Sequence, residues 1–272
     1  MQHNKKIFIY LGSQKCGSTW LYKLFSSHSN YIDNKFFWKE LDAWFHYKKS
    51  DIITKFKKSK NIFQFIIFLQ PKFYFKYFKM ILKNNLFTSD ISPSNIVLKK
   101  EDIFYIKQKF NKLNISVKFI LLIRDPVQRC LSAFNMLNKA NQKTGLFNNL
   151  IIQSSSLEEK FIFFYKTKYC TMRTQYEQIL SQTSILNQDD LRVFIYEDFF
   201  FNHKIKLLND FLGMNFDTQF TKEIIFSQKQ DFIFNYNILK DCALFYKDTY
   251  NFMSNKFPEV INMWDGYKYF KN

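Results

Sequence analysis

Short apolar runs recur along the chain and predict buried strands. Residues 5–11 (KKIFIYL) and 117–123 (VKFILLI) are almost continuously apolar. The first run is followed by Gly12, which is typical of a turn, and the second by Arg124, which is typical of a binding site. Such runs are typical of parallel strands that are covered by helices on both faces. Shorter runs at 86–90 and 191–196 predict two further strands.

Segments with helical spacing of apolar residues separate these strands. One predicted helix begins at Ser18. Further predicted helices cover 39–47, much of 51–84 with a break near Pro71, 101–112, 127–137, 171–182, 204–212 and 240–256. Alternating strands and helices predict an α/β protein with a P-loop-type three-layer fold, in which helices flank a central, mainly parallel sheet. No internal repeat or clear linker divides residues 1–272, which we interpret as a single domain. The polar segment 141–156 is predicted to be a mobile loop.

Composition excludes a disordered chain and points to an anionic partner. Of the 272 residues, 47% are hydrophobic and 20% aromatic, and 40 basic against 23 acidic side chains give a net charge of +17. Such an excess attracts nucleotides, nucleic acid, acidic glycans or an anionic membrane surface, and does not choose among them. The alternative is that lysines on solvated helix faces keep a Phe-rich protein in solution.

Cysteine spacing and the apolar stretches indicate where in the cell the protein is found. No CxxC pair occurs, so neither a metal site nor a disulfide framework is predicted. A reducing, cytoplasmic location is the simplest interpretation, with association to a membrane surface as the alternative. The most apolar long stretch, 62–82, carries too many polar groups to cross a bilayer, so we expect no transmembrane segment. The cysteines are Cys16, Cys130, Cys170 and Cys242.

The first candidate for chemistry is the loop 12–19 (GSQKCGST) between a predicted strand and helix. Its two glycines allow tight turns, and the loop amides with the following helix N-terminus can hold an anion. The lysine lies inside the loop, at Lys15, whereas Ser18 follows the second glycine. The magnesium-binding pattern of nucleoside triphosphatases is therefore not reproduced, and no metal is expected. The alternative is an ordinary turn from strand to helix.

The second candidate lies at the end of the strand 117–123. Arg124 follows this strand, and Ser132 comes eight residues later, two turns into the next predicted helix. Both can face the carboxyl edge of the sheet, where open α/β folds bind their ligands. A guanidinium and a hydroxyl there suit a phosphate. Alternatively, Arg124 pairs with a carboxylate and Ser132 is a small packing residue.

Together, and in this order, the two segments resemble the sulfotransferase family. The Lys39-Glu40 pair and the turn around Ser92-Pro93 resemble its carbohydrate-type and bacterial branches, and the resemblance covers about residues 5–214. It implies an enzyme that uses 3′-phosphoadenosine-5′-phosphosulfate (PAPS) as co-substrate. The loop would hold the 5′-phosphosulfate, and Arg124 with Ser132 the 3′-phosphate. The donor-binding residues are then Gln14, Lys15, Cys16, Gly17, Ser18, Thr19, Trp20, Arg124 and Ser132.

The resemblance also suggests catalytic roles. Lys15 would stabilise the leaving phosphate. Glu40 is our first choice for the base, because it matches the glutamate of the Lys-Glu pair, and Asp90 and His46 are the alternatives. Each has a structural interpretation as well: a solvated ion pair for Glu40, a brace for the Ser-Pro turn for Asp90, and packing among aromatic rings for His46. For a further contact to the 3′-phosphate near the C-terminus, Lys229 is the candidate.

The acceptor and the rival functions stay open. The Lys-Glu pair favours a carbohydrate or another hydroxylated metabolite as acceptor, and the oligomeric state is undetermined. One rival is a P-loop kinase that uses ATP and Mg²⁺. The other is a non-enzymatic nucleic-acid or membrane-surface binder, suggested by lysines among Phe and Tyr at 55–83, although an amphipathic helix pair over the core explains them better. We expect no nucleic-acid partner.

Overall fold

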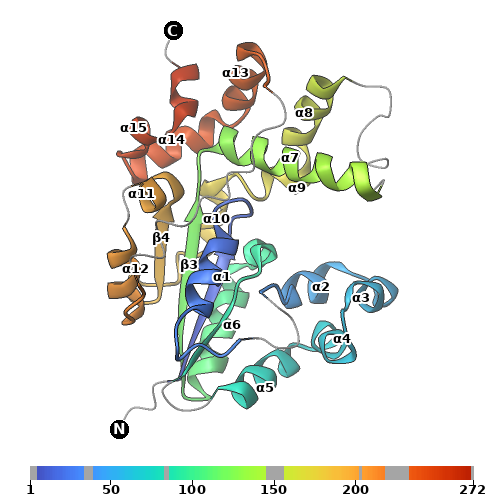
Figure 1. Cartoon of the computed structure of the whole chain (residues 1–272), viewed down its shortest axis with the longest axis vertical. Helices are drawn as coiled ribbons and strands as arrows, with labels where there is room; N and C mark the ends of the chain where they lie inside the picture. Colours follow the sequence, from blue (N-terminus) through green and yellow to red (C-terminus); the bar gives the residue numbers. More distant parts are fainter. Residues whose placement is uncertain are drawn as a thin grey trace.

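A parallel sheet of four strands forms the middle layer of the molecule (Figure 1). Its strands are β1 (Lys5–Gly12), β2 (Phe87–Asp90), β3 (Ile115–Ile123) and β4 (Leu191–Ile195), and their order is β2-β1-β3-β4. All three neighbouring pairs are parallel, which confirms the α/β prediction. The computed structural model describes residues 5–33, 39–82, 86–144, 156–201, 204–217 and 233–270.

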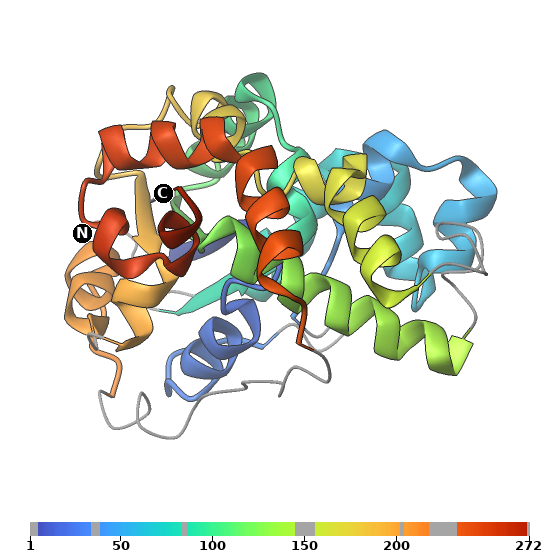
Figure 2. The ribbon, with the colours of Figure 1, turned by 90° about the horizontal axis from the view of Figure 1, so that it is seen from above.

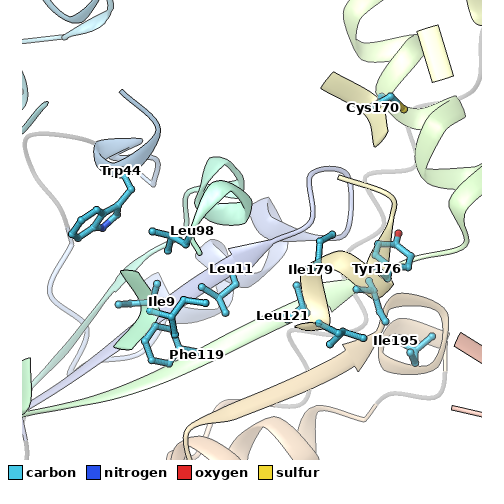
Figure 3. Close-up of a cluster of buried hydrophobic side chains, with 14 of the residues drawn as sticks. Ile9, Leu11, Trp44, Leu98, Phe119, Leu121, Cys170, Tyr176, Ile179 and Ile195 are labelled. Atoms are coloured by element: carbon cyan, nitrogen blue, oxygen red, sulfur yellow. The ribbon is translucent and has the colours of Figure 1, made fainter. Parts of the chain in front are cut away.

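The apolar runs of the sequence become strands that are buried on both faces. Odd-numbered side chains such as Ile9 and Phe119 lie in one core cluster, whereas even-numbered ones such as Phe8 and Ile120 lie in the other. This alternation is the two-residue period of a strand, and it explains why the runs show no polar face. Figure 3 shows part of the first cluster, where Ile9, Leu11, Phe119 and Leu121 meet Leu98, Tyr176, Ile179 and Ile195.

Helices cover the two faces unequally. The even-numbered face packs against α1 (Ser18–Ser26), α11 (Tyr196–Phe201) and α12 (Ile205–Leu212). The larger cluster on the odd-numbered face includes side chains from many more helices. Among these helices are α5 (Pro71–Ile81), α6 (Lys100–Asn111), α7 (Pro126–Thr144), α8 (Leu157–Lys166), α10 (Tyr176–Gln182), α13 (Tyr236–Phe245) and α14 (Lys247–Lys256).

The region after α1 differs from the prediction in two places. The helix predicted at 39–47 begins only at α2 (Ala43–Lys49), because Asp42 adopts the left-handed conformation with φ of 53°. The stretch 51–84 forms three helices instead of two: α3 (Ile52–Lys58), α4 (Ile62–Leu69) and α5. The extra break lies at Asn61, whose side chain caps α4 by accepting a hydrogen bond from the Gln64 amide at 2.9 Å. In both ribbon views α2, α3 and α4 lie to one side of the sheet (Figure 2).

Further along, most predicted helices are present with changed boundaries. The stretch 171–182 is divided between α9 (Lys168–Thr171) and α10, and 240–256 between α13 and α14. Helix α8 was not predicted, although Ser156 and Glu159 form a capping box at its start. Helix α7 takes up the first four residues of the predicted loop 141–156, and 145–155 lie outside the described residues. The remaining short elements of the described residues are η1 (Pro93–Val97), α15 (Val260–Met263) and η3 (Asp265–Tyr269).

Across the described ranges, no helix combines the length and the apolar character needed to span a bilayer. The long apolar stretch of the sequence is instead divided between α4 and α5, which bury residues such as Phe68 and Tyr74 in the core.

Candidate active site

The glycine-bounded loop connects β1 to α1 at the carboxyl edge of the sheet. Buried hydrogen bonds fix its first residue: the Ser13 amide donates to the Leu122 carbonyl at 2.7 Å, and the Tyr10 hydroxyl donates to the Ser13 carbonyl at 2.5 Å. The Ser13 hydroxyl donates to the Arg173 carbonyl, also at 2.5 Å. The next residues turn through left-handed conformations, with φ of 70° at Lys15 and 93° at Gly17.

Gly17 is required by its surroundings as well as by its backbone. A Cβ at this position would lie 2.7 Å from two ring atoms of Phe200. That ring packs edge-to-face on Trp20 at 4.9 Å and beside Tyr196 at 4.6 Å between centroids. The loop therefore passes very close to an aromatic wall, which only glycine permits at φ of 93°.

The loop opens into a cleft of about 530 Å³. This cleft brings together ten of the twelve residues that the sequence predicted for donor binding or catalysis, although they come from three separate stretches, 14–20, 40–46 and 124–132. Carboxyl edges of parallel sheets gather such residues because several strands end side by side there. The ten are Gln14, Lys15, Gly17, Ser18, Thr19, Trp20, Glu40, His46, Arg124 and Ser132.

Positive charge is concentrated in this cleft. Arg124 donates from Nη1 to the Lys15 carbonyl at 3.3 Å, and its guanidinium lies over the Tyr196 ring at 4.5 Å. The Arg124 Nε is 3.9 Å from a carboxylate oxygen of Glu197. Burial, followed by the charges of Arg124 and Lys39, lowers the pKa of Lys15. Cations crowded closely enough to lower the pKa of Lys15 indicate a site that gains stability when an anion binds.

The charge of the lining side chains supports the same conclusion. Among the residues that line the cleft, five are lysine or arginine and two are acidic. The basic ones are Lys15, Lys39, Lys58, Arg124 and Arg173, and the acidic ones are Glu40 and Asp42.

Lys39 is a lining residue that the sequence presented only as the neighbour of Glu40. Its side chain is buried, and Nζ donates to the Thr19 hydroxyl at 2.8 Å and approaches the Ser18 hydroxyl at 3.5 Å. The same Nζ is 2.9 Å from the Glu40 carboxylate. Lys39 thus connects the start of α1 to the candidate base, and the Lys-Glu spacing was the signal that could have shown it.

Arg173 was missed altogether. It lies between α9 and α10, is 6% exposed, and donates from Nη1 to the Tyr169 carbonyl at 2.8 Å. Its guanidinium packs over the Tyr169 ring at 4.1 Å, and the Tyr169 hydroxyl donates to the Gln14 side chain at 2.6 Å. No motif around Arg173 predicts this contact, because it depends on tertiary packing.

Two candidate bases line the cleft. The side chain of Glu40 is 35% exposed and paired with Lys39. His46 is more enclosed: Nδ1 lies 3.0 Å from the Ser50 hydroxyl, and the ring packs on Phe68 at 4.5 Å between centroids. Burial first, and then the charges of Lys58 and Lys55, lower the pKa of His46. The imidazole is consequently neutral at pH 7 and packed as the structural interpretation expects.

The third candidate base, Asp90, lies in the core and does not line the cleft. It accepts hydrogen bonds from the Ser92 hydroxyl at 2.5 Å, the Tyr74 hydroxyl at 2.9 Å and the Asn95 amide at 3.3 Å. Burial raises its pKa to about 6. The Ser92 hydroxyl in turn accepts from the Leu41 amide at 2.9 Å, so Asp90 supports the segment that follows Glu40.

Of the other predicted residues, Cys16 does not line the cleft. Cys16 is fully buried, and burial raises the pKa of its thiol to about 12. Its contribution to the loop is therefore its backbone. Lys229 lies outside the described residues.

A glycine-bounded anion loop at the carboxyl edge of a parallel sheet defines a P-loop-type α/β protein. The family model of the sulfotransferase domain matches residues 5–254, and the chain belongs to this family. It is accordingly a sulfotransferase, as the resemblance of the two segments implied.

Comparison with solved structures agrees on the fold. The crystal structure of a sulfotransferase from Alicyclobacillus acidocaldarius is 15% identical, with 91% of this chain and 94% of that chain covered and a TM-score of 0.58. The sulfotransferase domain of the Synechococcus PCC 7002 olefin synthase is 15% identical, with 88% of this chain and 84% of that chain covered and a TM-score of 0.46. Mouse sulfotransferase SULT7A1 complexed with PAP is 13% identical, with 87% of this chain and 70% of that chain covered and a TM-score of 0.47. No curated protein matched the sequence.

Proposed function

We propose that this sulfotransferase transfers the sulfuryl group of PAPS to a hydroxyl, or an amine, of a carbohydrate or another hydroxylated metabolite, as in the carbohydrate-type and bacterial branches. One observation carries the proposal: a single cleft contains both the phosphate loop and Arg124, which are joined by the 3.3 Å hydrogen bond from Arg124 Nη1 to the Lys15 carbonyl. One bisphosphorylated nucleotide can therefore contact both.

The residues of the cleft fit the two phosphate ends of such a donor. We assign the 5′-phosphosulfate to the loop amides, Ser18 and Thr19, where α1 begins. We assign the 3′-phosphate to Arg124 and Ser132, and this contact would favour PAPS over ATP. Tyr196 and Phe200 provide flat aromatic surfaces next to Arg124 for the purine ring.

The chemistry needs a base on the acceptor side and a cation on the leaving-group side. As the acceptor oxygen bonds to sulfur, the bond from sulfur to the bridging phosphate oxygen breaks, and Glu40 takes the acceptor proton. Lys15 stabilises the negative charge that develops on the bridging oxygen. Lys39 holds Glu40 and Thr19 together, and so sets the distance between the base and the donor loop.

The surroundings of the three carboxyl and imidazole candidates favour Glu40 as the base. It lines the cleft and keeps solvent access, whereas the hydrogen-bonding capacity of Asp90 is used by Ser92, Tyr74 and Asn95. We assign Asp90 to bracing the Ser-Pro turn. His46 is held between Ser50 and Phe68, and we assign it to shaping the acceptor side of the cleft.

The experiment that tests these roles compares Lys15→Ala, Glu40→Gln and His46→Asn with radiolabelled PAPS and a panel of acceptors. We expect kcat to fall by about 10²–10³ in Lys15→Ala and about 10²–10⁴ in Glu40→Gln, and to change much less in His46→Asn. Full activity in Lys15→Ala would refute the role of Lys15. A larger loss in His46→Asn than in Glu40→Gln would transfer the role of base to His46.

The rival kinase function is tested by ligand binding. 3′-Phosphoadenosine-5′-phosphate (PAP), the product left after sulfuryl transfer, should raise the melting temperature more than ATP with Mg²⁺ does. Only PAP has a 3′-phosphate to contact Arg124 in addition to a 5′-phosphate that contacts the loop. Stronger stabilisation by ATP with Mg²⁺ would favour the kinase.

Two further parts of the proposal concern organisation and location. We propose that residues 1–272 form one sulfotransferase domain, since the family match runs through most of them. We also propose a cytoplasmic location, because the four cysteines are all free thiols in the structure, as proteins of reducing compartments usually have them.

A further inference from the structure

Helix α3 is unusual because none of its seven residues is buried. Ile52, Ile53 and Phe56 are 62%, 64% and 64% exposed. Short helices in soluble proteins normally owe their stability to an apolar face packed on the core, so an exposed apolar helix indicates a contact outside the chain.

The neighbouring helix α4 extends this exposed apolar area. Ile62 and Phe63 at its start are 59% and 56% exposed, whereas Ile67 and Phe68 on its other side are buried. The rings of Phe56 and Phe65 pack at 5.4 Å between centroids and hold the two helices together. We call Ile52, Ile53, Phe56, Ile62 and Phe63 the α3–α4 surface. Both views place α3 and α4 at the outer side of the molecule, away from the sheet (Figures 1 and 2).

The chain around this surface is strongly basic. Residues 48–60 contain six lysines and a single acidic residue, Asp51. The Asp51 carboxylate caps α3 by accepting hydrogen bonds from the Thr54 amide at 2.9 Å and from the Thr54 hydroxyl at 2.7 Å. Exposed apolar side chains among lysines are typical of helices that lie in the interface of an anionic bilayer.

Aliphatic side chains also argue against a nucleic acid as the occupant. Bases stack on aromatic rings, but two of the three exposed apolar side chains of α3, Ile52 and Ile53, offer no flat π surface. Acyl chains and lipid headgroups complement branched aliphatic side chains and lysines at the same time.

The α3–α4 surface lies close to the active-site cleft. Lys58, the last residue of α3, lines the cleft, as do Phe45 and His46 of α2. His46 packs on Phe68 of α4, so α2 and α4 form one unit. A molecule held against α3 and α4 would therefore lie next to the acceptor side of the cleft.

We propose that the α3–α4 surface docks on a bilayer that contains anionic phospholipids, and that the acceptor hydroxyl is carried by an amphiphile held in that bilayer. The second half rests on the proposed function, whereas the docking itself does not. The lysines bring the protein to the anionic surface, and the apolar side chains enter the headgroup region. The cleft then faces hydroxyls at the membrane surface.

Vesicle binding tests the docking. The full chain should co-sediment with vesicles of equimolar phosphatidylcholine and phosphatidylglycerol, and only weakly with pure phosphatidylcholine. Ile52→Ser/Ile53→Ser should weaken binding by about tenfold or more, and Lys57→Gln by about fivefold. The matched controls are Leu244→Ser/Ile261→Ser, two side chains that are each 44% exposed on α13 and α15, and Lys247→Gln on α14. These should bind like the wild type.

The possible outcomes separate docking from catalysis. Equal binding to both vesicle types, or equal losses in the α3 variants and their controls, would overturn the proposal. So would a dimer by light scattering that Ile52→Ser/Ile53→Ser dissociates, because a second copy would then cover the surface. Sulfuryl transfer to a small soluble acceptor that the wild type uses should survive in Ile52→Ser/Ile53→Ser. Absence of transfer by the wild type to any acceptor, whether soluble or held in vesicles, would instead contradict the proposed function.

Discussion

Replacing Gly17 by alanine should disrupt the phosphate loop through two separable effects. The residue has φ of 93°, where a side chain is strained, and its new Cβ would lie 2.7 Å from the Phe200 ring. This ring cannot easily withdraw, because Trp20 and Tyr196 pack against it at 4.9 and 4.6 Å between centroids. The loop must therefore shift, and its amides with it.

The size of the effect follows from these two contacts. Left-handed backbone at a residue other than glycine costs about 1–2 kcal/mol. Overpacking against a fixed ring adds about 1–3 kcal/mol, so the free energy of unfolding should fall by about 2–5 kcal/mol. PAP affinity should fall at least about tenfold, because a displaced amide loses a charge-assisted hydrogen bond.

Another glycine supplies the control for the backbone effect. Gly213 has φ of 59°, but the nearest atom to its added Cβ would be Lys6 Nζ at 3.5 Å, an ordinary contact. Gly213→Ala should therefore lose only about 1–2 kcal/mol and keep its affinity for PAP. Urea unfolding and calorimetric titration with PAP measure both quantities. Trimming the ring in Gly17→Ala/Phe200→Leu should restore at least about 1 kcal/mol. Equal destabilisation of the two glycine variants, or no recovery in the double variant, would refute the steric reasoning.

Further predictions concern carboxylates and the arginine near the cleft. Burial, with the charge of Asp125 second, raises the pKa of Glu197 from 4.5 to about 7, so the native state binds a proton that the unfolded chain releases. Stability should therefore fall as the pH rises from about 4.5 to about 7, and Glu197→Gln should flatten this part of a plot of urea midpoint against pH; an unchanged slope would contradict the assignment. Asp90→Asn should lower the free energy of unfolding by about 1–3 kcal/mol while kcat per folded molecule stays within about threefold of the wild-type value, because its partners are structural. A kcat loss as large as that of Glu40→Gln would instead make Asp90 catalytic. Arg124→Gln should raise the Kd of PAP by about 10- to 100-fold and reduce its salt dependence, measured by calorimetry, and unchanged affinity would remove Arg124 from the site.

The parts of the site that the sequence could predict are those encoded by neighbouring residues. Each of the two predicted segments, residues 12–19 and 124–132, follows the end of one strand and runs into the next helix. The structure places both in one cleft. Local spacing was sufficient because parallel strands deliver their carboxyl ends to a common edge.

The parts that could not be predicted depend on contacts between distant segments. Arg173 reaches the cleft because Ser13 binds its carbonyl, and nothing in residues 168–176 indicates this. Likewise, α2 begins late because the Ser92 hydroxyl accepts hydrogen bonds from the Leu41 and Asp42 amides at 2.9 and 3.0 Å, which fixes a non-helical backbone there. Periodicity within a segment carries no information about such partners.

The three buried hydrogen bonds at Ser13 affect how the enzyme binds its donor. They tie β1, β3 and the Arg173 segment to one residue, so the loop acquires its shape when the core assembles. The entropy of ordering the loop is then lost during folding rather than during binding, and the encounter needs no rearrangement of the backbone. The same ties should make the Ser13 amide exchange its hydrogen about as slowly as the central strands, since the loop can open only when they separate.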